Sequence, residues 1–374
     1  MTYQRLSSIS KLLLVVALMS VAAIAQSAKP TPTPKIQEDE TVIKVDSRLV
    51  VVPVSVTNAN GDPVLGLTAK DFAIEEEGRK QTIENAGDAL SVPLEIALLF
   101  DVSASTDAMF RFEQETAAKF LKEVMRPDDR AVIYTIGQKP ILVQGRDTAE
   151  KATASVLNIS ATKGATAFFD TVGDAAKYLR TMSPDGRRRV ILVISDGEDN
   201  FSLGVQNAQR QYERNLVDKG PDPDYKKLGK VIVQAQNTAK NTERAKVLRA
   251  LQDADIVHYS INPAGSSYQL NQISVFGQEN MQIFSKETGG TAFLPKFAPV
   301  DTKDTYQNQN NMRKNTEILE QIFKQLANEL RAQYLIQYYS DSEYPKNKFV
   351  KLRISMPKRA DLHVRARDGY YVKN

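Results

Sequence analysis

The sequence predicts an α/β fold: a doubly wound parallel sheet, flanked by β strands from both ends of the chain. Segments with β and α patterns alternate repeatedly between residues 92 and 298. Within that block, Val190–Ile194 is an uninterrupted apolar run, as expected for a strand that is buried on both faces. The segments on either side, 41–91 and 334–374, show mostly the alternation typical of strands.

The N-terminus has the pattern of a secretory signal peptide, which we place at residues 1–25. Arg5 and Lys11 give a weakly positive start, and Leu12–Ile24 is almost wholly apolar. An uncleaved membrane anchor is the alternative, but the apolar run is short for a membrane span. Residues 26–40 are rich in Pro and Thr and predict a disordered linker. We therefore expect a secreted or periplasmic protein of the cell envelope, with no stable membrane span after cleavage.

Residues 41–91 predict an N-terminal β segment. Leu49–Val56 is rich in β-branched residues, Asn58–Pro63 is a cluster of turn formers, and Phe72–Gly78 resembles a second strand that ends in a glycine turn. The acidic run Glu75–Glu77 within it is expected to be a solvated strand end, with a calcium role as the alternative.

The α/β domain is expected to span residues 92–298. Its strands are expected at Leu94–Phe100, Ala131–Ile136, Arg189–Ile194, Ile256–Ile261 and Thr291–Leu294. Its helices are expected at Phe110–Met125, Thr148–Leu157, Ala167–Met182 and Asn280–Thr288, with a long charged region around Val205–Leu251. Residues 201–245, which overlap that region, are long and polar for a connection between strand and helix, so we interpret them as an insertion at the ligand-binding end of the sheet.

The last part of the chain predicts a loop, a helix and more strands. Residues 299–315 are rich in Asn, Gln and Lys and predict a polar loop, and 316–333 predict an amphipathic helix. Strands are expected at Tyr334–Tyr339, Phe349–Ser355 and Leu362–Tyr371. We predict that the strands of 41–91 and 334–374 join in a small β-sandwich-like unit into which the α/β domain is inserted.

The composition of the 374-residue chain excludes several kinds of site. There is no cysteine, so thiol catalysis, disulfides and thiolate zinc sites are absent. The two histidines, His258 and His363, offer little for a zinc site or a Ser-His-Asp triad. Net charge is +4, with acidic and basic residues spread along the chain, which does not indicate nucleic-acid binding.

A candidate metal motif follows the first strand of the α/β domain. Asp101, Ser103 and Ser105 alternate directly after the apolar run that ends at Phe100. Open α/β sheets bind ligands at the carboxyl ends of their strands. A carboxylate and two hydroxyls in a compact turn are hard oxygen ligands, which suit Mg²⁺.

Two further loops offer more oxygen ligands. Thr166 lies after Gly164 and just before a helix pattern, where it either caps the helix or turns its hydroxyl to a metal. Asp196 follows the most apolar strand and begins an Asp-Gly sequence, which on its own is an ordinary turn. Asp196 shares an edge with Asp101 if their strands are neighbours.

Together the three loops resemble the von Willebrand factor type A (VWA) family and its metal-ion-dependent adhesion site (MIDAS). The family pattern is D-x-S-x-S, then a Thr in a Gly-rich loop, then an Asp followed by Gly. Its five residues correspond here to Asp101, Ser103, Ser105, Thr166 and Asp196. The resemblance covers about 92–295 and implies a Rossmann-like VWA fold. The flanking β segments are similar to bacterial secreted proteins described only as related to this family. The insertion after Asn200 exceeds the usual family loop.

The resemblance implies a non-enzymatic, metal-dependent protein-binding module of the adhesion type. Mg²⁺, with Mn²⁺ or Ca²⁺ as alternatives, would be held by the five residues. One coordination position would stay open for an Asp or Glu of an unidentified protein partner. Neutral hydroxyl ligands leave such an ion electrophilic, which favours an incoming carboxylate.

Two rival functions stay open at this stage. One is a structural cell-envelope protein that uses the metal only as a stabiliser. The other, which is disfavoured, is a metal-dependent hydrolase. A phosphatase of the haloacid dehalogenase type would need a carboxylate where Ser103 stands, and a serine hydrolase would need a nucleophile elbow that Ser195 lacks.

Several conspicuous residues have a simpler structural interpretation. His258 lies in the strand pattern Ile256–Ile261 and is expected to be a core or flanking histidine. The basic run Arg187–Arg189, which precedes a buried strand, is expected to stay solvated. The tyrosines of the last strands are expected to be half-buried packing residues, namely Tyr334, Tyr338, Tyr339, Tyr370 and Tyr371.

Overall fold

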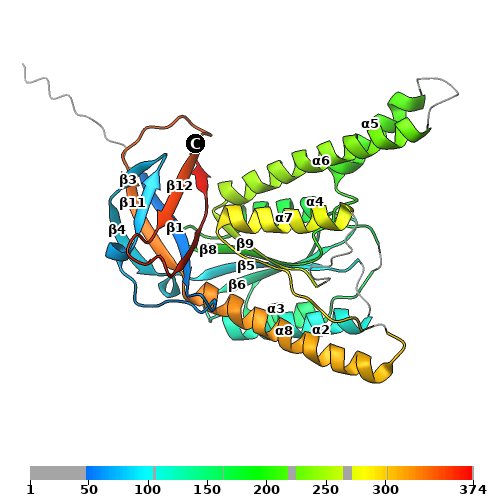
Figure 1. Ribbon diagram of the computed structural model, residues 1–374, viewed down its shortest axis with the longest axis horizontal. Coiled ribbons are helices and arrows are strands. Elements are labelled where there is room, and N and C mark those ends of the chain that lie inside the picture. Colours follow the sequence, from blue (N-terminus) through cyan, green and yellow to red (C-terminus); the bar gives the residue numbers. More distant parts are fainter. Residues whose placement is uncertain are drawn as a thin grey trace, which may run out of the picture. The chain divides into compact units, whose positions relative to one another are not determined.

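A computed structural model describes residues 48–103, 107–162, 164–217, 225–263, 272–300 and 302–372 (Figure 1). The expected signal peptide and linker at 1–40 lie outside the described residues, as does Ser105. Within the described ranges, no helix combines the length and apolar character that crossing a membrane requires.

The α/β domain is built on a six-stranded sheet in the order β10-β9-β8-β5-β6-β7. Five strands run parallel, and β7 joins the edge antiparallel to β6. The strands are β5 (Leu94–Asp101), β6 (Arg130–Ile136), β7 (Ile141–Asp147), β8 (Arg188–Ile194), β9 (Ile256–Ile261) and β10 (Ala292–Phe293). The doubly wound parallel sheet that was expected is therefore present, and β7 is an additional strand that the sequence did not indicate.

Helices cover both faces of this sheet because successive residues of a strand point to opposite sides. Leu94, Ile96, Leu98 and Phe100 of β5 face one core, whereas Ala97 and Leu99 face the other. Figure 1 shows α2, α3 and α8 on one side and α4, α6 and α7 on the other. The bounds are α2 (Asp107–Val124), α3 (Ala149–Leu157), α4 (Phe168–Met182), α5 (Leu203–Val217), α6 (Tyr225–Asp253), α7 (Gln272–Thr288) and α8 (Thr305–Arg331).

Strands from both ends of the chain form two further four-stranded sheets, in the orders β13-β1-β11-β4 and β14-β12-β2-β3. In the first, β1 pairs antiparallel with β11 and β13, so the N- and C-terminal segments join as expected. An apolar core of residues from both sheets lies between them. The strands are β1 (Arg48–Thr57), β2 (Ala73–Glu76), β3 (Arg79–Gln81), β4 (Ile83–Asp88), β11 (Tyr334–Ser340), β12 (Phe349–Ser355), β13 (His363–Ala366) and β14 (Gly369–Tyr371). Two 3-10 turns, Ala69–Asp71 and Ala89–Ser91, complete the elements.

The prediction of a loop at 299–315 is wrong from Thr305 onward, because α8 begins there and runs without a break into the expected amphipathic helix. The Asp304 side chain caps the start by accepting hydrogen bonds from the amides of Tyr306 and Gln307. The amide-rich sequence has a further role that composition did not reveal. The buried Asn315 side chain donates to, and accepts from, the backbone of Ala298. Polar residues here fasten the preceding segment to the helix.

The described part of the long polar region after Asn200 is mostly helical. α5 and α6 pack against each other, and the C-terminal part of α6 packs on α4, α7 and β9. Among the α6 positions whose burial is described, the first buried one is Val247. Residues 220–224, whose Gly-Pro-Asp-Pro-Asp sequence favours a break, lie outside the described residues.

The expectation of a solvated acidic run at Glu75–Glu77 is wrong for its central residue. Strand alternation turns Glu76 into the core between the two sheets, where it is fully buried. Its carboxylate accepts hydrogen bonds from the hydroxyls of Tyr338 at 3.0 Å, Tyr370 at 2.6 Å and Ser340 at 2.8 Å. Tyr334, Tyr338 and Tyr370 are buried, as packing residues would be, whereas Tyr339 is mainly exposed.

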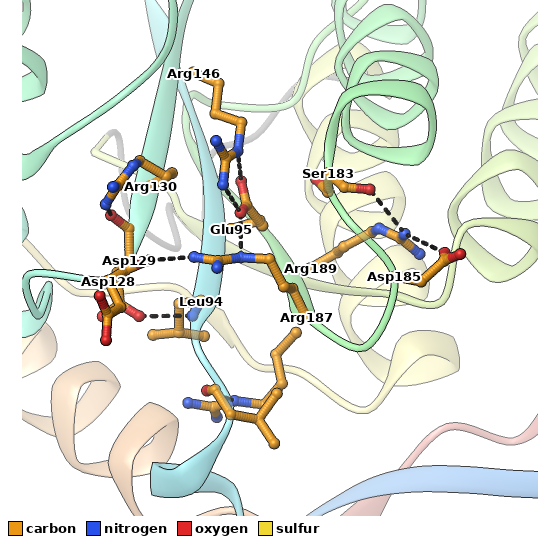
Figure 2. A network of polar contacts seen from close by, with 12 residues as sticks. Leu94, Glu95, Asp128, Asp129, Arg130, Arg146, Ser183, Asp185, Arg187 and Arg189 are labelled. Carbon is orange, nitrogen blue, oxygen red and sulfur yellow. Dashed lines mark hydrogen bonds and ion pairs between the residues drawn. The ribbon is translucent and has the colours of Figure 1, made fainter.

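The basic run Arg187–Arg189 is likewise not solvated. Glu95, at the start of β5, is 1% exposed and forms ion pairs with Arg187 and Arg146 (Figure 2). Arg188 donates to the backbone carbonyls of Val92 and Leu330. Arg189 donates to the carbonyls of Ser183 and Ala254. These arginines stabilise the amino-terminal end of the sheet, because a buried carboxylate and buried carbonyl groups need hydrogen-bond donors there.

Candidate metal site

The first metal-motif residue, Asp101, lies at the carboxyl end of β5. Its Oδ1 accepts hydrogen bonds from the Ser103 hydroxyl at 2.6 Å and from the Ser103 amide at 3.0 Å. The turn that follows β5 therefore folds the Ser103 side chain back onto Asp101. Ser105 lies outside the described residues, so the D-x-S-x-S motif is described only through Ser103.

The register of the sheet places a serine beside Asp101. β5 and β8 are parallel neighbours, with Phe100 opposite Ile194, so the next residues along the chain, Asp101 and Ser195, emerge side by side. The Ser195 hydroxyl donates to Asp101 Oδ2 at 2.6 Å and accepts from the Gly197 amide at 3.0 Å. Ser195 thus links the first loop to the loop that carries Asp196.

The Asp196 loop is held in a tight turn against α7. Gly197 has a positive φ of +76°, which favours glycine, and the Asp196 carboxylate accepts from the Glu198 amide at 3.0 Å. Opposite it lies Gly277 of α7, where an added Cβ would stand 2.7 Å from the Asp196 carbonyl oxygen. The Asn280 side chain of α7 donates to the Gly197 carbonyl at 3.2 Å. Both glycines are therefore needed for this close approach of backbones.

The Thr166 loop contacts both of the other loops through its backbone. The Gly164 amide donates to the Ser103 carbonyl at 3.2 Å. The Thr166 amide donates to the Asn200 side chain at 2.8 Å, and the Thr166 carbonyl accepts from the amides of Asn200 and Phe201. The three loops are therefore joined at one edge of the sheet.

Thr166 is not the cap of the helix that follows, although capping was its simpler interpretation. The N-cap position of α4 is Ala167, and the first-turn amides are satisfied from another loop. Asp199 accepts from the Phe169 amide at 2.9 Å, and the Ser202 hydroxyl accepts from the Asp170 amide at 3.1 Å. Because other residues cap α4, the buried Thr166 hydroxyl is not required for that role.

The electrostatics of the edge favour a bound cation. Burial, together with the nearby carboxylates of Asp101 and Glu198, raises the pKa of Asp196 to about 6. Burial also raises the pKa of Asp101, although hydrogen bonds from Ser103 and Ser195 oppose the shift. Like charges that are withdrawn from water repel one another, and a divalent cation between them would remove that penalty.

The donor set fits a hard, octahedral ion such as Mg²⁺. The candidate donors at this edge are carboxylates and hydroxyls, the oxygen types that Mg²⁺ takes. Among the described residues, no group of three or more His, Cys, Asp or Glu side chains is arranged to hold a metal. Of the five candidate ligands, Asp101 and Asp196 are carboxylates and the other three are hydroxyls.

Sequence reasoning missed the residues that support the candidate ligands. Ser195 was considered only as a nucleophile, and Asp199 and Asn200 were not assigned a role. Each lies within the polar run Ser195–Asn200, directly after a strand that is buried on both faces. Such a run is a usable signal, because a loop at a ligand-binding edge needs polar groups to hold its own backbone.

His258 has the structural role expected of it. It lies fully buried in β9, its Nδ1 is 3.1 Å from the Ser285 hydroxyl, and its ring packs edge-on against Phe284. Burial lowers its pKa to about 3, so the imidazole is neutral at physiological pH.

Comparison with known proteins gives distant structural likenesses only. No protein-family model matches the chain, and no curated protein matches it. Proximal thread matrix protein 1 from the mussel byssus, solved with zinc in its MIDAS motif, is 12% identical with a TM-score of 0.39, over 68% of this chain and 50% of its own. A von Willebrand factor type A structure from Catenulispora acidiphila is 10% identical with a TM-score of 0.37, over 74% of this chain and 51% of its own.

A third structure, the conserved hypothetical protein BatB from Bacteroides thetaiotaomicron, is 14% identical with a TM-score of 0.33. It is matched over 59% of this chain and 99% of its own. These structural neighbours are VWA-domain proteins, though distant ones, and the chain spans about half the length of the first two.

Proposed function

We propose that the α/β domain is a VWA-type, metal-dependent protein-binding module. In this proposal Asp101, Ser103, Ser105, Thr166 and Asp196 hold Mg²⁺, or Mn²⁺ or Ca²⁺ in its place, and a partner protein supplies an Asp or Glu carboxylate. The observation that carries the proposal is the meeting of three separate loops at the carboxyl edge of the sheet. Their order along the chain is that of the adhesion motif.

The bound ion would supply an electrophilic coordination position that accepts a carboxylate oxygen. This chain's own residues prepare that position. The Ser103 hydroxyl is held 2.6 Å from Asp101 Oδ1, and Ser195 fixes the second oxygen of the same carboxylate. Neutral hydroxyl ligands offset little of the ion's charge, so an incoming carboxylate gains a charge-assisted contact.

The expected setting of this activity is the cell envelope or the exterior. The signal-peptide pattern of residues 1–25 supports secretion or a periplasmic location. A partner is therefore sought among envelope or extracellular proteins that display an acidic side chain.

A crosslinking pull-down from the native envelope tests the proposal. The mature protein is used as bait, with Mg²⁺ or with chelator, beside Asp196→Asn and the matched control Asp185→Asn. Asp196 follows strand β8, whereas Asp185 precedes it and is fully exposed. The control therefore removes the same charge at the opposite end of the strand, away from the site. We expect capture with Mg²⁺ for the wild type and the control only. Equal capture with chelator would contradict metal-dependent binding.

Thermal unfolding and an activity assay separate the two rival functions. If Mg²⁺ raises the melting temperature but leaves capture unchanged, the ion is only a structural stabiliser. If a general phosphate- or ester-hydrolysis substrate is turned over with Mg²⁺ and not after Asp101→Ala, the module is an enzyme. We expect Mg²⁺ to raise the melting temperature and to be required for capture of the partner. We expect no turnover of the hydrolysis substrate.

A further inference from the structure

The helix α6 carries an excess of positive charge close to the candidate metal site. Its sequence has seven Lys and Arg against two Asp and Glu. Two of the cations pair within the helix, Lys246 with Glu243 at 2.7 Å and Arg249 with Asp253 at 3.7 Å. Lys240 and Arg244 behave differently, because both turn toward the neighbouring helix α7.

Lys240 and Arg244 lie over one aromatic ring. The Lys240 ammonium is 5.7 Å and the Arg244 guanidinium carbon 4.8 Å from the centre of the Phe276 ring. Residues four apart share a helix face, so the two cations form one positive surface, defined here as the Lys240–Arg244 face. The ring attracts both cationic groups without neutralising their charge.

This face is continuous with the metal edge. Phe276 is followed by Gly277, whose backbone packs directly on the Asp196–Glu198 loop. Lys240 is attracted electrostatically by Glu198 and Asp199 of the same loop. Figure 1 shows α6 running alongside α7. The two cations thus contact Phe276, and the next residue of α7, Gly277, packs on the loop that carries Asp196.

Among the described residues, neither cation has an ion pair shorter than 3.7 Å. The ion pair of Arg244 is with Glu279 at 3.7 Å, and Lys240 is half-buried. Burial lowers the pKa of Lys240, so its charged form gains from an added anion. An opposite charge brought by a partner would offset this desolvation.

We infer that the partner-binding surface extends from the metal edge across the Lys240–Arg244 face, and that the partner presents an acidic segment. This rests on the proposed function. One carboxylate of the segment reaches the metal, and at least one more contacts Lys240 and Arg244. Positive charge at both places selects a partner with clustered Asp and Glu over one with a single exposed carboxylate.

Fluorescence anisotropy with a labelled oligoglutamate peptide tests the inference. The full mature chain is titrated with Mg²⁺ or with chelator, as wild type, Asp101→Ala, the double variant Lys240→Gln/Arg244→Gln, and a control, Lys246→Gln/Arg249→Gln. The control is matched because it also removes one Lys and one Arg, both exposed, from another face of α6. We expect chelator and Asp101→Ala to weaken binding, the double variant to weaken it about tenfold, and the control to change it less than about twofold.

The outcomes separate the inference from the proposed function. Equal binding by the double variant and the control, with Mg²⁺ still required, would overturn the inference alone. Binding that does not require Mg²⁺ but depends on Lys240 and Arg244 would overturn the proposed function. It would support the Lys240–Arg244 face as a surface for an acidic partner. Equal binding of an oligothymidylate of matched charge through the same two residues would identify a general polyanion surface and overturn the inference. Unfolding curves of the double variant that match the wild type show that the fold is kept.

Discussion

The two ends of strand β5 handle a carboxylate in opposite ways. At its start, Glu95 is buried and forms ion pairs with two arginines, Arg146 and Arg187 (Figure 2). At its end, Asp101 accepts hydrogen bonds from two serine hydroxyls and lies near the carboxylates of Asp196 and Glu198. At the start of β5 the negative charge of Glu95 is neutralised by arginines of the same chain. At the end of β5 several carboxylates lie close together without such partners among the described residues.

We infer that the amino-terminal end of β5 has a structural role and that its carboxyl end is available for binding a ligand. An ion pair completed inside the chain contributes to the folded state and has no need of a ligand. Clustered carboxylates with neutral donors leave the fold with an electrostatic cost that a cation can remove. Substitutions of Glu95, Gly277 and Asp196 test this contrast, and His258 gives a separate test of the buried sheet.

Removing Glu95 should cost the most stability. Glu95→Ala leaves two arginines without their buried partner, which typically costs about 3–5 kcal/mol. Urea unfolding measures the loss in free energy of unfolding, with Asp185→Ala as the exposed control. Metal affinity of the folded variant should be unchanged. A loss below about 1 kcal/mol would show that the amino-terminal end is not held by this ion pair.

Acid should destabilise the protein through His258, which lies at neither end of β5. Its folded pKa of about 3 is below the unfolded value near 6.5, so the stability from keeping it neutral is complete above pH 6.5 and is lost as pH falls toward 3. The expected slope is about 1.4 kcal/mol per pH unit. His258→Phe should remove that slope from unfolding curves between about pH 6 and 4. An identical slope in both proteins would place the acid-sensitive group elsewhere.

Gly277→Ala, a substitution on α7, should disturb the loop that carries Asp196. The new Cβ would meet the Asp196 carbonyl at 2.7 Å and the Glu198 amide nitrogen at 2.8 Å, so the loop or α7 must shift. We expect a loss of about 1–3 kcal/mol in the free energy of unfolding together with weaker Mg²⁺ binding. Gly173→Ala on α4 is the control, since its Cβ would meet only a Val247 side-chain carbon at 3.9 Å. Unchanged Mg²⁺ affinity in Gly277→Ala would contradict the positioning role.

Asp196→Asn should have the smallest effect on stability, and its sign should be opposite to that of Glu95→Ala. Without metal, the substitution removes a buried charge that neighbouring carboxylates repel, so the free energy of unfolding should rise by about 1 kcal/mol. The measurement is urea unfolding in chelator. A clear loss of stability in the absence of metal would show that Asp196 is stabilising by itself, as Glu95 is.

The sequence predicted the sheet well because its signals are local. Uninterrupted apolar runs such as Val190–Ile194 and the helical spacing of Ala117, Phe120, Leu121 and Val124 decide both element type and buried face. The polar segment at 299–315 was misjudged because its buried Asn315 binds the backbone of Ala298, a contact that composition does not encode. The same limit applies to Glu76 and Arg187, whose partners lie far away in the chain.

The candidate site was predictable in part. Motif spacing identified Asp101, Ser103, Thr166 and Asp196, and the described loops that carry them meet at one edge. Ser195 could not be assigned, because its role depends on the register of β5 against β8, which places its hydroxyl 2.6 Å from Asp101. Likewise, the capping of α4 by Asp199 and Ser202 requires knowing which loops are neighbours in space.

The most direct test of the contrast between the two ends of β5 is a Mg²⁺ titration by calorimetry on chelator-treated protein. Wild type, Asp101→Ala and Glu95→Gln are compared under conditions in which all three are folded. We expect Mg²⁺ binding by the wild type and by Glu95→Gln, and a loss of at least about tenfold in affinity for Asp101→Ala. Equal Mg²⁺ affinity of Asp101→Ala and the wild type would contradict this expectation.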